Sequence, residues 1–147
     1  IETRPDLAPK HVKQIKQLIS EKKYDGVVFH RVIEGFMAQT GDVEFGNSSN
    51  DSYDINRAGT GGSYLSDIEA EFSEENHGRG AVSMARANNP NSANSQFFIC
   101  FEDASFLNGQ YTIWGYVIEG IQFVDNIKLG EPPKDPDKII KMEIVSK

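Results

Sequence analysis

The segment FHRVIEGFMAQTGD, residues 29–42, places two polar side chains inside apolar runs. Arg31 lies in the middle of an apolar strand pattern, and Gln39 lies in the short apolar run that follows. Burying a guanidinium without a partner is costly, so a fold should retain Arg31 only where something needs it. Its charge is permanent and its N–H donors are rigidly placed, which suits it to hold a polar group of a substrate.

The histidines and the cysteine do not form a catalytic or metal-binding set. His30 alternates with Arg31 along the strand and should point to its opposite side, so a structural role is predicted. His11 and His77 are predicted to lie on the surface. Three separated histidines and a single cysteine, Cys100, make a poor set of metal ligands. We therefore predict no metal and no cofactor.

Two loop segments could hold an ion, and their patterns disfavour it. The acids Asp42, Glu44, Asp51 and Asp54 could bind calcium, but their spacing differs from that of a hand loop. The GTGG segment, residues 59–62, lacks the lysine and the helix that a phosphate loop needs. It is predicted to be a turn that lines a groove.

Composition limits the class of protein. A chain of 147 residues fits one domain with a core, and the net charge of −7 argues against a nucleic-acid or anionic-membrane partner. No window reaches the roughly 18 apolar residues of a membrane span. One cysteine excludes an internal disulfide and suits a reducing compartment. We expect a cytoplasmic monomer, although the chain starts without Met and export stays open.

Short strands and two helices must position these side chains. Apolar residues recur at helical spacing over residues 8–23 and 120–129. Strands are predicted over residues 1–3, 27–33, 36–39, 80–85, 96–101, 111–118 and 139–145, with Trp114 in the core. Residues 43–63 are rich in Gly, Asn, Ser and Asp and predict a long surface loop. Many short strands with two covering helices indicate a β-barrel.

Four longer blocks are more specific. They are FHRVIEGFMAQTGD, GTGG, SMARANNPNSANSQFFI and FLNGQYTIWG. In order and spacing they resemble the cyclophilin family of peptidyl-prolyl cis-trans isomerases, in its bacterial branch, over nearly the whole chain. The resemblance implies a mainly β fold, a closed eight-stranded antiparallel β-barrel capped by two α-helices, as one domain over residues 1–147. The family usually has one more strand before Ile1, so we expect the natural protein to be longer.

The resemblance implies a role for Arg31 and Gln39. The family catalyses rotation about X–Pro bonds and assists protein folding, against a barrier of roughly 18–20 kcal/mol. A twisted amide nitrogen can accept a hydrogen bond, so a fixed cation beside it stabilises the twisted state. Arg31 matches that cation. Gln39 matches the glutamine that binds the substrate backbone and steadies the arginine.

The same resemblance implies a substrate groove. The positions that hold the proline ring, line its rim or bind the peptide are Phe36, Met37, Arg86, Gln96, Phe98, Phe106, Leu107 and Tyr111. Three of them depart from the commonest family residues. Phe106 replaces a tryptophan linked to cyclosporin binding, so only weak cyclosporin binding is expected. Tyr111 replaces histidine, and Arg86 replaces asparagine.

Two other functions fit part of the pattern. A non-catalytic module could use the same groove to hold proline-containing segments, but it would not need Arg31. A barrel that binds a small molecule inside is disfavoured, because a small closed barrel fills its interior with side chains. The expected partners are proline-containing peptides and unfolded proteins.

Overall fold

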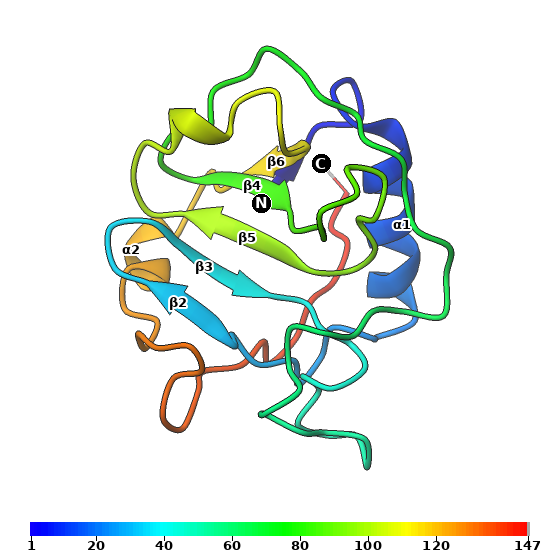
Figure 1. Ribbon diagram of the computed structural model, residues 1–147, viewed down its shortest axis with the longest axis vertical. Coiled ribbons are helices and arrows are strands. Elements are labelled where there is room, and N and C mark those ends of the chain that lie inside the picture. The colour runs from blue at the N-terminus through cyan, green and yellow to red at the C-terminus, as the bar shows by residue number, and fades with distance from the viewer. Residues whose placement is uncertain (147) are drawn as a thin grey trace.

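An antiparallel sheet of six strands forms the centre of the computed structural model, which describes residues 1–146 (Figure 1). The strands are β1 (Glu2–Thr3), β2 (Arg31–Ile33), β3 (Met37–Thr40), β4 (Ala81–Met84), β5 (Phe97–Cys100) and β6 (Ile113–Tyr116). Their order is β1-β6-β4-β5-β3-β2. The sheet is open, with β1 and β2 at its edges. The mainly β prediction is confirmed, whereas the closed eight-stranded barrel is not.

Helix α1 (Pro9–Ser20) covers one face of the sheet and confirms the first predicted helix. Pro9 stands in the first turn, where its missing N–H costs no helical hydrogen bond. The apolar stripe of α1 packs on side chains of β4, β5 and β6, and the largest of these is Trp114, which is fully buried as predicted. The buried apolar residues of the stripe are Val12, Ile15, Leu18 and Ile19. No helix within residues 1–146 is long and apolar enough to cross a membrane.

The C-terminal part of the chain differs from the prediction. Helix α2 (Ile121–Val124) is much shorter than the predicted helix over residues 120–129, because the chain continues in tight turns. The predicted strand over residues 139–145 is wrong for the described part of that segment. Its main chain bonds irregular partners instead: Ile139 N–H donates to Val27 O, and Met142 N–H donates to Asp25 Oδ1. Isolated bridges pair Lys138 with Val28 and Gly130 with Val32 of β2.

Two histidines predicted for the surface are buried. His11 lies on the apolar stripe of α1, and its Nδ1 is 2.6 Å from Glu71 Oε1. His77 contacts Asn108 through Nδ1 and Ser83 through Nε2, both at 2.9 Å. Each ring therefore has a polar partner inside the fold, which offsets the cost of burial.

Strand register places the polar and apolar groove residues in one row. Arg31 of β2 pairs with Gln39 of β3, and Gln39 pairs with Phe98 of β5. Phe98 in turn pairs with Ser83 of β4. Directly paired residues point to the same face of a sheet. The row therefore lies on the face opposite α1.

Candidate functional site

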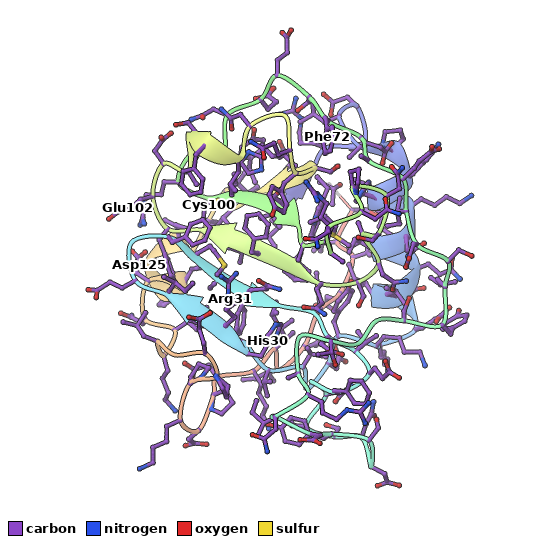
Figure 2. All side chains as sticks on the ribbon, in the orientation of Figure 1. His30, Arg31, Phe72, Cys100, Glu102 and Asp125 are labelled. Carbon is purple, nitrogen blue, oxygen red and sulfur yellow. The ribbon has the colours of Figure 1, made fainter. Side chains whose placement is uncertain are left out.

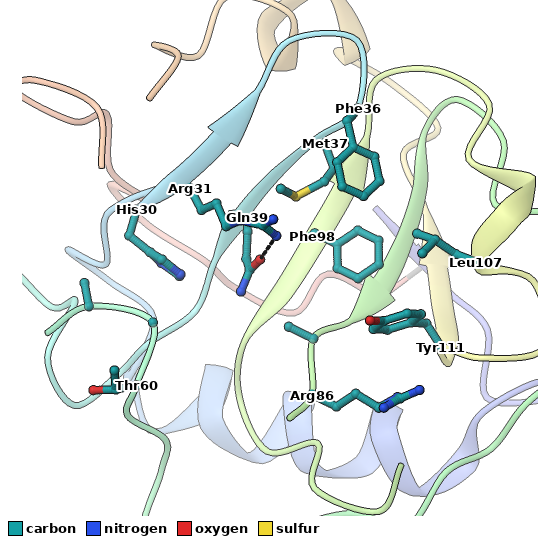
Figure 3. A pocket seen from close by; sticks show the side chains of 13 residues that line it. His30, Arg31, Phe36, Met37, Gln39, Thr60, Arg86, Phe98, Leu107 and Tyr111 are labelled. Carbon is teal, nitrogen blue, oxygen red and sulfur yellow. Dashed lines mark hydrogen bonds between the residues drawn. The ribbon is translucent and has the colours of Figure 1, made fainter. Parts of the chain in front are cut away.

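A groove of about 390 Å³ opens on this face of the sheet (Figure 3). It is lined by every predicted site residue except Gln96 and Phe106. These lining residues are Arg31, Phe36, Met37, Gln39, Arg86, Phe98, Leu107 and Tyr111. They come from β2, β3 and the residue before it, the segment just after β4, β5, and the segment from η1 (Ser105–Leu107) to β6. Residues far apart in the sequence thus line one groove.

A chain of hydrogen bonds crosses the polar side of the groove. Arg31 Nε donates to Glu131 Oε1 at 2.7 Å, and Arg31 NH1 donates to Gln39 Oε1 at 3.4 Å. Gln39 Nε2 donates to Gln96 Oε1 at 3.1 Å, and Gln96 Nε2 donates to the main-chain oxygen of Gly61 at 2.9 Å. Arg31 is thus held from two sides, with 43% of its side chain exposed. The protein uses only some of the guanidinium N–H donors of Arg31.

The other side of the groove is an apolar slot. Met37 and Phe98 form its floor and are buried, while Leu107 closes one end. Tyr111 meets Phe98 edge to face, with ring centroids 5.9 Å apart. Aromatic and methionine side chains suit a small apolar ring, since they supply contact area with few polar atoms. Figure 3 shows the Arg31 guanidinium pointing toward this slot.

Arg86 is fixed at the rim. Its guanidinium carbon lies 4.6 Å from the centre of the Tyr111 ring. Its Nε donates to Gln110 O at 2.9 Å and its NH1 to Ala87 O at 3.0 Å. Arg86 stands where asparagine is commonest and Tyr111 where histidine is commonest. The Arg86 cation therefore stacks on another rim residue of unusual type.

The two predicted residues outside this groove lie next to it. Gln96 lines an adjoining hollow of about 210 Å³ together with Gln39 and Arg86. Phe106 packs on Phe36 with ring centroids 5.5 Å apart and is 66% exposed. It forms an outer lip of the slot and does not line the cavity itself.

His30 lines the groove, contrary to the prediction from strand parity. Regular pairing of β2 begins only at Arg31, so the alternation does not extend back to His30. Figure 2 labels the His30 and Arg31 side chains near the start of β2. Its Nδ1 is buried and has no hydrogen-bond partner among the described residues. Burial lowers the pKa of His30 below its usual value, Asp42 opposes that shift, and the charge of Arg31 adds to it.

Asp42 is a fully buried carboxylate that ties the loop wall together. Its Oδ1 accepts the N–H groups of Glu44 and Phe45, and its Oδ2 accepts those of Gly59 and Gly61. A Cβ on Gly61 would lie 2.5 Å from Oδ1, so the loop can approach only as glycine. The GTGG turn therefore lines the groove as predicted, held in place by Asp42.

The prediction missed two contributors. Glu131 contacts Arg31 from 100 positions away in the sequence, and no local pattern marks it. Ala58, which directly precedes the GTGG turn, also lines the groove. Within residues 1–146, no group of three or more His, Cys, Asp or Glu side chains could hold a metal ion. Burial raises the pKa of the Cys100 thiol to about 12, so this side chain is not a nucleophile near neutral pH.

The site therefore combines a partly free cation, a row of amides and an apolar slot. A family model described as cyclophilin type peptidyl-prolyl cis-trans isomerase/CLD matches residues 1–144. The chain is 60% identical to a probable peptidyl-prolyl cis-trans isomerase of Brucella abortus, over 98% of this chain and 76% of that protein. It is 37% identical to peptidyl-prolyl cis-trans isomerase B of Bacillus subtilis, over 91% of this chain and 85% of that protein.

A solved structure is similar over the same extent. It is a cyclophilin type peptidyl-prolyl cis-trans isomerase of Cryptosporidium parvum, determined in the presence of the dipeptide Ala-Pro. Its TM-score to this chain is 0.82 at 30% sequence identity, covering 99% of this chain and 91% of that one.

Proposed function

The chain belongs to the cyclophilin-type peptidyl-prolyl cis-trans isomerase family, and from this premise we propose that the groove between Arg31 and Tyr111 is its active site. The protein is a peptidyl-prolyl cis-trans isomerase. In this proposal Arg31 and Gln39 are the catalytic residues, and the apolar slot takes the proline ring.

Arg31 acts on the twisted state of the peptide bond. When an X–Pro bond rotates, amide resonance is lost and the proline nitrogen regains a lone pair. A donor that reaches this nitrogen is stronger in the twisted state than in the planar one, which lowers the barrier. The observation that carries the proposal is that Arg31 NH2 makes no hydrogen bond within residues 1–146, while Nε and NH1 are used. This end of the fork is left for the substrate.

Gln39 both orients Arg31 and contributes to substrate binding. It accepts from Arg31 NH1 and donates to Gln96, so its amide couples the cation to the wall of the adjoining hollow. A peptide in the groove would set its proline on Phe98 and Met37 and extend past Gln96. Proline-containing segments of unfolded or flexible proteins fit this description, as does the Ala-Pro present with the C. parvum relative. Rotation moves no proton or electron, so the reaction requires no cofactor.

The test is a protease-coupled isomerisation assay on a short X–Pro peptide. We expect Arg31→Ala to lower kcat/KM by roughly 10²–10³ while the fold stays intact, because it removes a donor that acts mainly in the transition state. Arg31→Lys should also be poor, since a point charge does not reproduce the fork. Arg79→Ala is the matched control, because Arg79 forms an ion pair of the same 2.7 Å length with Asp125, outside the groove.

A folded Arg31→Ala variant with nearly full activity would refute the proposal. A chain that binds the peptide but accelerates no rotation, with Arg31 present, would favour the non-catalytic binding module instead. Circular dichroism and thermal unfolding of each variant show whether the fold is kept.

A further inference from the structure

We propose that Glu131 is a positioning residue for the isomerisation reaction, which holds the Arg31 guanidinium at the angle that catalysis needs. The inference rests on the proposed role of Arg31. Glu131 Oε1 accepts from Arg31 Nε at 2.7 Å, which is the shortest contact that Arg31 makes in the described chain. The Gln39 contact on the other side is longer, at 3.4 Å, and alone would leave the fork loosely fixed.

Main-chain pairing places Glu131 opposite Arg31. Val32 N–H donates to Gly130 O at 2.8 Å, and Gly130 N–H donates to Val32 O at 2.9 Å. This bridge is antiparallel, so the neighbouring pair is Arg31 with Glu131. Arg31 therefore has Gln39 as its cross-strand neighbour on one side and Glu131 on the other. The two partners bind different nitrogens and leave the NH2 end directed to the slot.

The segment that carries Glu131 is itself fixed. Lys128 N–H donates to Asp137 Oδ2 at 2.9 Å, and Lys128 Nζ donates to Asp135 O at 2.8 Å. Gly130 has a φ of +143°, and a Cβ there would lie 2.6 Å from Pro133 Cα, so the tight path requires glycine. Glu131 is thus presented from a closed loop at the edge of β2, and this loop is the orange segment below β2 in Figure 1.

Charge assistance and geometry favour a positioning role over a role in stability. Both side chains are about half exposed, at 43% and 55%, and an exposed ion pair contributes little to folding. Its directional effect is larger, because the Nε bond fixes the plane of the guanidinium. Glu131 does not line the groove, so it need not touch the substrate.

The test compares Glu131→Gln, Glu131→Ala and Glu131→Asp in the isomerisation assay, with separate kcat and KM from line-shape NMR on a proline peptide. We expect Glu131→Ala to lower kcat about two- to fivefold with KM unchanged, as suits the loss of one exposed ion pair. Glu131→Gln should lie between it and the wild type, and Glu131→Asp should restore part of the loss. The Arg31 Nε–H resonance should shift and broaden in the Ala variant.

Asp125→Asn is the matched control. It removes an ion pair of equal length and similar exposure, and Asp125 lies near α2, apart from Arg31 (Figure 2). It should leave kcat unchanged. In an Arg31→Ala background, Glu131→Ala should have no further effect.

Three outcomes separate the proposals. Unchanged or increased kcat in Glu131→Ala, while Arg31→Ala loses its activity, would overturn the role of Glu131 and leave that of Arg31 intact. An active Arg31→Ala variant would overturn both. A rise in KM alone would assign Glu131 to substrate binding and also reject the positioning role.

Discussion

Phe97 and Phe98 are neighbours on β5 that point to opposite faces of the sheet, and they allow a direct test of the site. Phe97 packs under α1, edge to face with Tyr24 at 5.6 Å and with Trp114 at 5.4 Å. Phe98 faces the groove, edge to face with Tyr111 at 5.9 Å and stacked on His77 at 6.3 Å. Both are nearly buried, with 2% and 5% exposed. Each therefore has two ring contacts but a different neighbourhood.

We expect Phe97→Leu and Phe98→Leu to destabilise the fold equally and to affect catalysis unequally. An aromatic pair is worth about 0.5–1.5 kcal/mol, so losing two lowers the free energy of unfolding by about 1–3 kcal/mol in either variant. Only Phe98 contacts the proposed proline slot. A poorly filled apolar pocket costs roughly 10–200-fold in discrimination, so Phe98→Leu should lower kcat/KM about tenfold or more.

Urea unfolding measures the first quantity and the protease-coupled assay measures the second, on the same protein samples. Each variant serves as the control for the other, because strand, substitution and burial match. Equal kinetic losses in the two variants would mean that activity follows stability and that the slot is misplaced. A larger loss in Phe97→Leu would contradict the assignment of the groove face.

Further expectations concern pH and the lip of the slot. Because Arg31 stays charged and burial keeps His30 neutral, kcat/KM should be nearly flat from about pH 7 to 9. A tenfold change in kcat/KM per pH unit that His30→Asn abolishes would place proton transfer in the mechanism. Burial lowers the pKa of His11, His30 and His77 below 6.5, so the unfolded chain binds more protons than the folded one. The free energy of unfolding should therefore fall as pH drops below 6.5. Urea titrations that show a rise would contradict this. Phe106→Trp should strengthen a weak inhibition by cyclosporin with little change in peptide turnover, because indole adds an N–H donor. Tight inhibition of the unmodified chain, measured by titration, would contradict the expectation.

The sequence predicted the family, the isomerase function and the first helix, because these depend on long motifs and on regular spacing. The stripe that ends in Leu18 and Ile19 has the helical period over several turns, and α1 buries it. The same period could have placed His11 inside, since it lies four residues before Ile15 and seven before Leu18 on that stripe. Its polar type outweighed its position in the prediction, and its partner Glu71 could not be inferred from the sequence.

The predictions failed where long-range pairing decides the structure. Residues 139–145 have strand-like composition, but their partners are single main-chain groups and the Asp25 carboxylate. The described C-terminal segment meets Val28 and Val32 only at isolated bridges and adds no strand to the open sheet. Strand parity misplaced His30, since regular pairing begins one residue later. Glu131 was missed for the same reason, because only tertiary register brings it to Arg31.

The Asp42 carboxylate makes the shape of the groove independent of the length of the loop over residues 43–58. It binds main-chain groups at both ends of residues 43–58, directly after β3 and again at Gly59 and Gly61. Residues 46–48 also pair with residues 26–28, so only the exposed turn that follows them, around residues 50–52, can vary at small cost. Doubling the length of a flexible loop costs only about 0.6 kcal/mol in closure entropy. This turn is therefore a suitable insertion point for a reporter peptide or a binding epitope in an engineered isomerase. The anchors would hold the groove wall while the loop carries the inserted peptide.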